Sequence, residues 1–318
     1  SADWMAWKRA DTRCARAHQR LDKLAAREKD ETLLARTGIR QLRANPLFLT
    51  PRRRALFGET TEGLEIENTE PIGEVGHERT CYVCREKFTA VHHFYDQMCV
   101  QCGDFNFAKR SQTADLTGRV ALVTGARVKI GYQAAIMLLR AGCFVIVLTR
   151  FPKDAALRYS REDDFDEWGD RLEIHGIDLR HTPSVEALCD RLLTRQIPID
   201  VLINNAGALF NDYAETSEGI ERSAALLLLS PWRMTERLLP LLEDHQTPAR
   251  VINVVSGGMY TQKLRCAQLV MTKQTYNGSV AYARAKRALT VLTEQWAEEW
   301  QASSIVVNSM HPGWADTP

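Results

Sequence analysis

The sequence predicts an α/β protein whose C-terminal two thirds form a doubly wound parallel sheet, preceded by a helical arm and a small cysteine-rich module. Three observations lead to this prediction. Beyond residue 116, short apolar runs rich in β-branched residues alternate with segments of helical periodicity. A glycine-containing turn, residues 125–131, directly follows the first of these runs. Two Cys-x-x-Cys pairs lie upstream of it, within residues 80–110.

The order of the expected strands and helices indicates a parallel sheet. We expect strands at residues 120–123, 144–148, 172–177, 201–203, 251–255 and 305–307. We expect helices between them at residues 130–140, 183–194, 218–242 and 280–300. Short, continuously apolar strands that alternate with helices are typical of a sheet covered on both faces. Because such crossovers are right-handed, the helices divide between the two faces of a doubly wound, Rossmann-type sheet.

The first 79 residues differ from the rest in charge and pattern. Lys and Arg outnumber Asp and Glu in residues 1–58, whereas residues 59–78 contain Glu but no Lys or Arg. We predict a basic helical arm for residues 1–58 and an acidic linker for residues 59–79. One face of the expected helix, residues 3–36, carries the small or apolar residues Trp7, Ala10, Cys14, Ala17, Leu21 and Leu24. We expect this face to dock on the protein's own body, and the alternative is a contact with a second subunit or another protein.

The composition argues against several classes of function. The chain has 318 residues and a formal net charge of +1, and none of its apolar runs reaches the ~18–20 residues of a membrane span. Its first residues lack the apolar core of a secretory signal, and the cysteines outside the two pairs lie singly among apolar residues. We therefore expect a cytoplasmic protein without a membrane span. Nucleic-acid binding rests only on the charge of residues 1–58 and is disfavoured.

Four cysteines form a pattern typical of a zinc site. The two Cys-x-x-Cys pairs, fourteen residues apart, consist of Cys81, Cys84, Cys99 and Cys102. Four thiolates suit the tetrahedral coordination of Zn²⁺, so residues 80–110 are predicted to hold one structural zinc. The alternative is an ordinary cluster of buried cysteines. Because four cysteines complete the ligand set, we interpret His92 and His93 as packing or surface residues.

The turn at residues 125–131 predicts a dinucleotide site. Gly125 and Gly131 allow the backbone to approach a pyrophosphate, and the free N–H groups of the following helix favour its negative charge. The segment Asn-Asn-Ala-Gly, residues 204–207, follows another expected strand, and Asp178 follows a third. Open parallel sheets bind their ligands at the carboxyl ends of the strands. The three segments are therefore expected to meet around one nucleotide.

Five motifs follow one another in this part of the chain. They are Thr124-Gly125 with Lys129 and Gly131, the segment 204–207, Ser256, Tyr282 with Lys286, and Pro312-Gly313. Together they resemble the short-chain dehydrogenase/reductase family, over residues 116–318. The residues after Ser256 and around Pro312 look closest to an uncharacterised branch related to retinol-dehydrogenase-like members. The long separation of Ser256 from Tyr282 is similar to that branch too, in which an extra loop borders an apolar substrate pocket.

The resemblance implies roles for individual side chains. Tyr282 exchanges a proton with a substrate hydroxyl or carbonyl, Lys286 follows one helical turn later, and Ser256 hydrogen-bonds the substrate oxygen. A neighbouring ammonium favours the phenolate of a tyrosine, whose unperturbed pKa is ~10. The cofactor-binding residues that the motifs and the resemblance together indicate are Gly125, Arg127, Lys129, Ile130, Gly131, Arg150, Asp178, Leu179, Asn205, Ala206, Gly207, Tyr282, Lys286, Pro312 and Gly313.

The end of the second expected strand favours NADP(H) over NAD(H). NAD needs an acceptor for its ribose 2′-hydroxyl, usually an acid after the second strand, but this strand ends in Thr149-Arg150. Arg150 and Arg127 can both reach a 2′-phosphate there, and the arginine guanidinium pairs well with phosphate. The alternative for Arg150 is a surface ion pair with Asp163 or Asp164.

Three features depart from the family pattern. Lys129 replaces the middle glycine of the phosphate turn, where it either crowds the backbone or adds positive charge. Leu227 stands where the family has a proton-relay asparagine, and a leucine cannot hold the water that connects Lys286 with solvent. The family continues beyond Pro312-Gly313 with substrate-loop helices and a seventh strand, so we expect the domain in residues 116–318 to be incomplete at its C-terminal end.

These residues predict an NADP(H)-dependent oxidoreductase that interconverts a carbonyl and an alcohol on an apolar small molecule. The alternative is an NADP(H)-sensing binding protein with weak or no catalysis. It would use the cysteine-rich module and the N-terminal helix to engage a protein partner or to form a homo-oligomer. The pair Tyr282 and Lys286 favours the enzyme, whereas Leu227 and Lys129 favour the alternative.

Overall fold

The computed structural model describes residues 2–44, 70–243 and 247–313. It divides the chain into two compact units, Ser1–Thr113 and Ala114–Pro318. Within the described residues, no helix is both long enough and apolar enough to cross a membrane.

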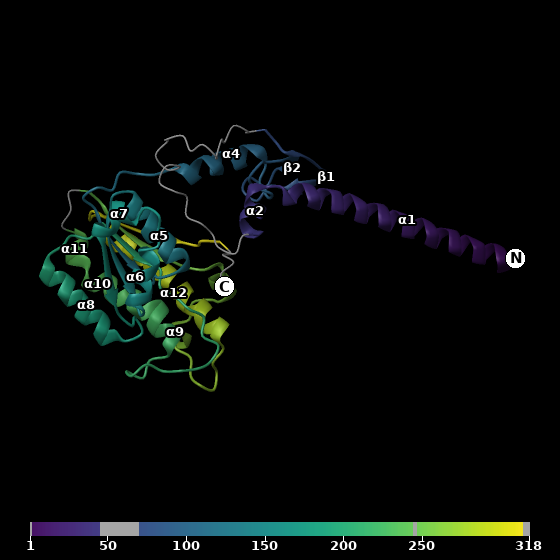
Figure 1. Ribbon diagram of the computed structural model, residues 1–318. Coiled ribbons are helices and arrows are strands. Elements are labelled where there is room, and N and C mark those ends of the chain that lie inside the picture. The colour runs from purple at the N-terminus through teal and green to yellow at the C-terminus, as the bar shows by residue number, and fades with distance from the viewer. Residues whose placement is uncertain (1, 45–69, 244–246, 314–318) are drawn as a thin grey trace. The chain divides into compact units, whose positions relative to one another are not determined.

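The first unit combines a long helix with a two-stranded sheet and two short helices (Figure 1). Its elements are α1 (Ala2–Ala35), α2 (Gly38–Ala44), β1 (Gly73–Thr80), β2 (Lys87–Val91), α4 (Val100–Ala108) and the 3₁₀ turn η1 (Lys109–Ser111). β1 and β2 pair antiparallel. Leu34 of α1, Val75 of β1 and Val91 of β2 form a small buried cluster that joins the helix to the sheet.

The structure differs from two expectations in this unit. β1 begins at Gly73, so the segment 59–79, predicted to be an acidic linker, ends in a strand; the pairing with β2 and the burial of Val75 stabilise it. α1 covers nearly the expected residues, but Ala17, Leu21 and Leu24 are exposed. This part of the helix face is therefore not packed against the rest of the first unit. The side chains of residues 7, 10 and 14, and the segment 45–69, lie outside the described residues.

The second unit contains a six-stranded sheet in the order β5-β4-β3-β6-β7-β8, and every neighbouring pair is parallel. The strands are β3 (Val120–Thr124), β4 (Phe144–Thr149), β5 (Leu172–Gly176), β6 (Val201–Asn204), β7 (Ala249–Val254) and β8 (Ile305–Met310). The chain first builds outward from β3 through β4 to β5, and it then returns to place β6 on the other side of β3. The strand order reverses between β3 and β6, which makes this the topological switch point of a doubly wound sheet. The predicted fold class is confirmed.

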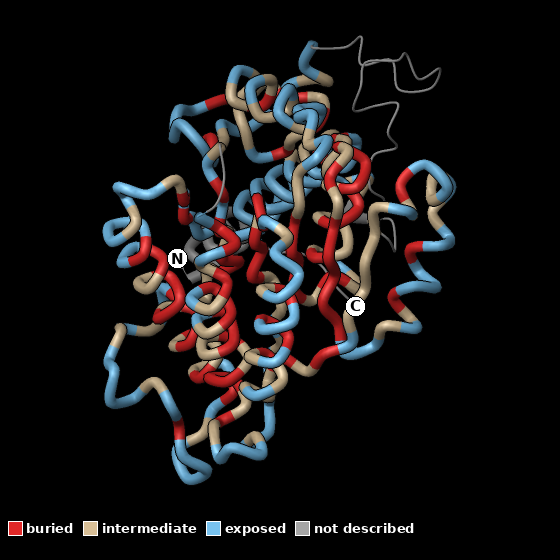
Figure 2. The backbone as a smooth tube through the Cα atoms, turned by 90° about the vertical axis from the view of Figure 1, so that its left-hand side faces the viewer, coloured by how far each residue is buried: buried red, intermediate tan, exposed pale blue. Residues whose placement is uncertain are grey.

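Helices cover both faces of this sheet, and the buried strands lie between them (Figure 2). They are α5 (Lys129–Arg140), α6 (Pro152–Tyr159), α7 (Phe165–Trp168), α8 (Thr182–Arg195), α9 (Arg222–Ala224), α10 (Ser230–Arg237), α11 (Leu239–Glu243) and α12 (Gly278–Glu299). Short turns η2 (Gly169–Arg171), η3 (Ala225–Leu229), η4 (Gly257–Thr261) and η5 (Cys266–Gln268) connect them. Because side chains alternate along a strand, Leu122 enters the core that contains Trp296, whereas Val123 enters the core that contains Trp168.

The segment 218–242, expected to be one helix, is broken into several pieces. It begins later, at α9, where the Glu221 carboxylate accepts hydrogen bonds from the backbone N–H groups of Ser223 and Ala224. A π-helical turn, η3, then separates α9 from α10. Pro231 has no N–H to bond the carbonyl of Leu227 four residues earlier, so a regular α-helix is interrupted here. This irregular turn packs against α12, the helix that carries Lys286.

Candidate functional site

The turn after β3 is packed so closely that it requires glycine at two positions. Gly125 has a φ of 68°, and a Cβ atom there would lie 2.8 Å from the Cα atom of Ala206. A Cβ atom at Gly131 would lie 2.4 Å from Nδ2 of Asn205 and 2.6 Å from the carbonyl oxygen of Gly125. The turn therefore leads into α5 without side chains at these two positions, so a pyrophosphate could approach its backbone N–H groups.

The hydroxyl of Thr124 joins this turn to the end of β6. Its Oγ1 accepts hydrogen bonds from the backbone N–H groups of Asn205 and Ala206, both at 2.9 Å. The Nδ2 group of Asn205 donates in return to the carbonyl of Thr124, at 2.9 Å. The segments 125–131 and 204–207, expected to meet, are thus held together at the switch point of the sheet.

Lys129 adopts a conformation that suits glycine better. It is the first residue of α5, its φ is 60°, and its side chain is exposed. A left-handed conformation costs a residue with a Cβ atom roughly 1–2 kcal/mol. The backbone of the family's glycine turn is therefore retained at this position, and a positive charge stands exposed at the N-terminal end of α5.

Arg127 and Arg150 both lie close to the exposed ring of Phe151. Their guanidinium carbons lie 5.1 Å and 5.3 Å from the centre of this ring, and Arg127 also pairs with Asp154 at 2.6 Å. Arg150 forms no ion pair with any residue that the structure describes. One acid offered as its alternative partner, Asp164, pairs with Arg140 instead. The guanidinium of Arg150 thus remains available at the end of β4.

Asp178 follows β5 and is held by Arg180, a residue outside the set that the motifs indicate. Its carboxylate accepts hydrogen bonds from the backbone N–H and the guanidinium of Arg180. These bonds hold the pKa of Asp178 below its ordinary value, and the charge of Arg150 acts in the same direction. Leu179, the next residue in the expected cofactor set, is buried. A spacing of two residues between an acid and an arginine after a strand is the pattern that indicates such a pair in the sequence.

Lys286 is buried at the carboxyl end of β7. Its Nζ atom donates to the carbonyl of Val254 at 2.6 Å, and burial lowers its pKa to about 8. Tyr282 lies one turn earlier on α12 and is half-buried. Ser256 follows Val254 by two residues, and its Oγ accepts a hydrogen bond from the N–H of Gly258 at 3.3 Å. This hydrogen bond of the lysine side chain therefore connects the helix that carries Tyr282 with the strand that leads to Ser256.

The start of the Pro312-Gly313 motif lies beside the loop after Ser256. The N–H of Val255 donates to the carbonyl of Met310 at 2.9 Å, and the N–H of Gly257 donates to Nδ1 of His311 at 3.2 Å. Gly313 has a φ of 83°. β8 thus brings this motif to the same end of the sheet as the other four.

Leu227 fills the space next to Lys286 with carbon. Leu227 is buried, and its Cδ2 atom lies 3.2 Å from the position that a Cβ atom of Gly207 would take. The same position is 3.8 Å from Nζ of Lys286. The side chain at the family's relay position therefore offers the lysine no polar atom.

The extra segment between Ser256 and Tyr282 is anchored to the loop after β6. The hydroxyl of Tyr276 donates to the carbonyl of Phe210 at 2.8 Å and lies 3.1 Å from Oγ of Ser223. A Cβ atom at Gly278 would lie 1.9 Å from the same carbonyl, so only glycine fits there. Tyr260 and Val270 of this segment and Leu209 of the neighbouring loop are exposed.

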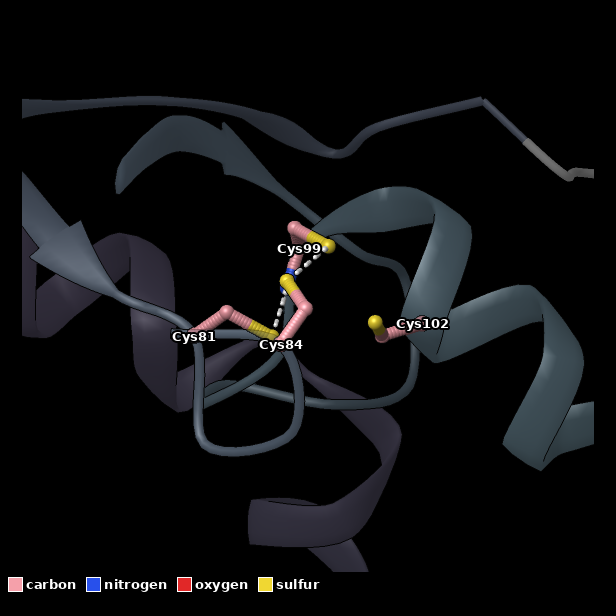
Figure 3. Close-up of side chains that lie close together, drawn as sticks. All are labelled: Cys81, Cys84, Cys99 and Cys102. Atoms are coloured by element: carbon pink, nitrogen blue, oxygen red, sulfur yellow. Dashed lines mark hydrogen bonds between the residues drawn. The ribbon is translucent and has the colours of Figure 1, made fainter. Parts of the chain in front are cut away.

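In the first unit, the four predicted cysteines converge (Figure 3). Their Sγ atoms all lie within 4.8 Å of one another, and those of Cys84 and Cys99 are 3.8 Å apart. A tetrahedron with the usual Zn–S bond of ~2.3 Å has sulfur atoms about 3.8 Å apart. The N–H of Cys99 also points at Sγ of Cys81, at 3.4 Å. Arg85, with a φ of 68°, lets the chain turn back after Cys84.

The pKa of the Cys81 thiol lies below its ordinary value. Burial alone would raise its pKa, but the backbone N–H groups of Cys99, Cys84 and Val83 outweigh burial and lower it to about 6. Such N–H groups stabilise a thiolate, the form of cysteine that binds metals. The fit of the donor set to Zn²⁺ rests on the convergence of the four sulfur atoms.

His92, His93 and Asp104 form a second group of potential ligands. Nδ1 of His92 accepts hydrogen bonds from the N–H groups of Phe94 and Tyr95, at 2.9 Å and 3.1 Å. The ring proton of neutral His92 is therefore on Nε2, which faces Asp104 at 3.2 Å. Because a protonated nitrogen cannot bind a metal, we interpret His92 as a packing residue of the module.

Comparisons with known proteins agree with this geometry. The family model for the short chain dehydrogenases matches residues 119–318, and the chain belongs to this family of oxidoreductases. It is 35% identical over 214 residues to human dehydrogenase/reductase SDR family member 12, which covers 67% of this chain and 66% of the relative. It is 32% identical over 205 residues to mouse retinol dehydrogenase 14, covering 62% of this chain and 61% of that protein.

A solved structure of the RhlG/NADP active-site complex of Pseudomonas aeruginosa is also similar, with a TM-score of 0.51 and 29% sequence identity. The similarity covers 63% of this chain and 74% of that one. The chain thus spans about two thirds of the length of the curated relatives, and the matches correspond in extent to the second unit.

The close packing of Gly125 leads to a first prediction. Gly125→Ala should destabilise the second unit and weaken binding of a nicotinamide dinucleotide, because the methyl group meets both a left-handed φ and the backbone of Ala206. Gly118→Ala is the matched control: Gly118 has a φ of 77°, but nothing lies within 4 Å of its Cβ position. We expect the control to lose about 1 kcal/mol and Gly125→Ala to lose roughly 1–3 kcal/mol more. Urea unfolding measures both, and equal losses would contradict the packing argument.

Proposed function

We propose that the protein is an NADP(H)-dependent oxidoreductase that interconverts a carbonyl and an alcohol on an apolar small molecule. The observation that carries this proposal is the buried Lys286, hydrogen-bonded at the end of β7 and one helical turn from Tyr282. A lysine is rarely fully buried without a function or a partner charge. Membership of the short chain dehydrogenase family supports the reaction class.

In this proposal the side chains handle the proton. Tyr282 gives its proton to the substrate oxygen during reduction and takes it back during oxidation. The ammonium form of Lys286 favours the phenolate by its charge, and Ser256 donates a hydrogen bond that orients the substrate oxygen. The bound nicotinamide supplies or accepts the hydride. The bare glycine turn at residues 125–131, which a Cβ atom would obstruct, fits the dinucleotide's pyrophosphate.

The choice of NADP(H) rests on the end of β4. Thr149 is directly followed by Arg150 and not by an acid, and the guanidinium groups of Arg150 and Arg127 both lie close to the ring of Phe151. Two guanidinium groups can each donate hydrogen bonds to a 2′-phosphate, and the ring of Phe151 offers a flat surface on which an adenine can stack. The similarity to a structure described as an NADP complex supports the same choice.

An apolar substrate is favoured by the segment that precedes α12. Leu209, Tyr260 and Val270 are exposed there, on loops that follow the carboxyl ends of β6 and β7. Exposed apolar side chains near the end of a parallel sheet suit an apolar ligand. Similarity to retinol dehydrogenases supports this substrate class.

A second candidate function is an NADP(H)-binding protein with little turnover. It is favoured by Leu227, which places carbon rather than a relay group next to Lys286. In that case the exposed Leu21 and Leu24 of α1 would contact a protein partner or a second copy of the chain. Tight NADPH binding without turnover on a panel of aldehydes, ketones and retinoids would support this candidate. Absence of NADPH binding would exclude both.

We further propose that the four cysteines of the first unit hold one structural zinc ion. A complete set of four ligands leaves no coordination position for a substrate. The buried cluster of Leu34, Val75 and Val91 is small, so a metal would contribute much of the stability of this unit.

The catalytic proposal predicts that Tyr282→Phe strongly lowers turnover while NADPH still binds. The substitution removes only the hydroxyl that carries the proton, so the rate should fall by ~10²–10⁴-fold. Steady-state kinetics with an aldehyde or retinoid substrate and fluorescence titration of NADPH measure the two properties. Tyr82→Phe, an exposed tyrosine of the first unit, is the control. Turnover that survives Tyr282→Phe would refute the mechanism.

The cofactor proposal predicts that Arg150→Ala weakens binding of NADPH but not of NADH. Loss of a charge-assisted hydrogen bond costs about 1.5–3 kcal/mol, which corresponds to a roughly 10- to 100-fold higher Kd. Arg161→Ala, which removes another exposed arginine of the second unit, serves as the control. If Arg150→Ala weakens both cofactors equally, Arg150 does not recognise the 2′-phosphate.

The zinc proposal predicts one zinc per chain in metal analysis of the purified protein. Cys84→Ser should release the metal and lower the unfolding temperature of the first unit, because one of its four ligands becomes a poor one. Cys266→Ser changes an exposed cysteine outside the cluster and should do neither. Full stability of Cys84→Ser, with no zinc in the wild type, would show an ordinary cysteine cluster.

A further inference from the structure

α1 carries a narrow apolar stripe that the described part of the first unit leaves uncovered. Ala17, Leu21 and Leu24 repeat at intervals of four and three residues, so their side chains lie on one side of the helix. Leu21 is 62% exposed and Leu24 is 53% exposed. Upstream, the sequence continues the same intervals at residues 14, 10 and 7. A stripe of two residues in every seven is typical of a coiled-coil seam and is narrower than the face by which a helix packs on a globular core.

Among the described residues, the last turns of α1 hold it to the rest of the first unit. Asp30 accepts a hydrogen bond from the N–H of Gly76 at 2.7 Å, and Leu34 is buried against β1 and β2. Every residue from Ala15 to Lys29 except Ala26 is exposed. Figure 1 shows this part of the helix extending beyond the other elements of the first unit. It therefore lacks the packing of an amphipathic face from which most helices in proteins take their stability.

A ridge of basic residues runs directly beside the apolar stripe. This basic ridge also repeats at intervals of four and three residues, and its members, all of them exposed, are Arg16, Arg20, Lys23 and Arg27. In a heptad that begins at Leu21, the ridge occupies the c and g positions and the stripe occupies the a and d positions. None of the four forms an ion pair with a residue that the structure describes. From Ala15 to Lys29, this flank of the stripe therefore carries positive charges and no acid.

This charge pattern is unfavourable for pairing of α1 with a second copy of itself. In a parallel pair, the g residues of one helix face the e residues of the other, so Arg20 would face Ala25 of the second copy. In an antiparallel pair, g residues face g residues, and the arginines of the two ridges would meet. Like charges that meet across an interface repel each other. Neither arrangement gives the basic ridge an acidic partner.

We propose that α1 binds an acidic amphipathic helix of another protein as a two-stranded coiled coil. Leu21 and Leu24 supply the seam, and the basic ridge pairs with Asp or Glu side chains that flank the seam of the partner helix. A lipid surface is disfavoured, because the apolar stripe is narrow and the acidic Asp22 stands on its other flank. The interaction does not depend on the proposed oxidoreductase function.

The first test uses the full chain and two synthetic helical probes of about four heptads. Both probes carry leucine at a and d, but one carries glutamate and the other lysine at e and g. Fluorescence anisotropy should show binding of the glutamate probe that weakens as the salt concentration rises, and no binding of the lysine probe. Leu21→Asp should raise the Kd for the glutamate probe at least about 10-fold, because a charge replaces a leucine of the seam. Equal binding of both probes, or binding of neither, overturns the proposal.

A reversal of charge separates recognition from folding. The double variant Arg20→Glu, Arg27→Glu should no longer bind the glutamate probe and should bind the lysine probe instead, a gain that an unfolded helix cannot give. The control is Lys29→Glu, which reverses an exposed charge of the same helix outside the ridge and should keep the wild-type preference. If the double variant does not bind the lysine probe, the basic ridge does not select the partner and the proposal fails.

The other occupants of the stripe are tested with Leu21→Asp. Sedimentation velocity of the full chain measures self-association, and flotation with vesicles of phosphatidylcholine and phosphatidylserine measures lipid binding. We expect the substitution to change neither property. Self-association that Leu21→Asp abolishes would assign the stripe to a second copy, vesicle binding that it abolishes would assign the stripe to a lipid surface, and either result overturns the proposal.

Discussion

The hydroxyl of Thr124 is the contact on which the candidate site depends. It accepts two backbone N–H groups from the loop after β6, and the amide of Asn205 returns a hydrogen bond to the same strand end. These bonds cross the point where the strand order reverses, so they close the base of the cleft in which parallel sheets bind ligands. The glycines of the phosphate turn follow from this contact, because the backbones approach too closely for a Cβ atom.

A second constraint is the burial of a charge. Lys286 extends from α12 to the carbonyl of Val254, and its low exposure lowers its pKa to about 8. The residues around this lysine differ from the family pattern on the side of Gly207 and are polar on another side. Leu227 places an apolar side chain on the side of Gly207. The polar residues Asn204 and Ser230 line a small pocket together with Lys286.

The first unit illustrates how a small domain compensates for a limited core. Its strands β1 and β2 bury little more than Val75 and Val91 against α1, and the four cysteines converge where β1 and α4 meet. The turn after Cys84 needs a left-handed residue, and Arg85 supplies it. Backbone N–H groups directed at Cys81 stabilise its thiolate. Backbone geometry and ligand chemistry thus agree on a metal site, whereas His92 is fixed by its hydrogen bonds in a form that cannot bind one.

The sequence by itself determined that the sheet is parallel and doubly wound. It also located the glycine turn at residues 125–131, the cysteine pairs, and Tyr282 with Lys286. These features depend on local patterns, such as alternating apolar runs, glycine at a turn and a spacing of four residues on a helix. Tertiary structure alone decided that Arg180 holds Asp178, that residues 218–242 break at a π-helical turn, that β1 extends into the expected linker, and that Asn204 and Ser230 share a pocket with Lys286. The physical reason is that each of these contacts pairs a group with whatever the fold brings beside it, and no spacing along the chain records which polar atoms remain unsatisfied once the core has formed.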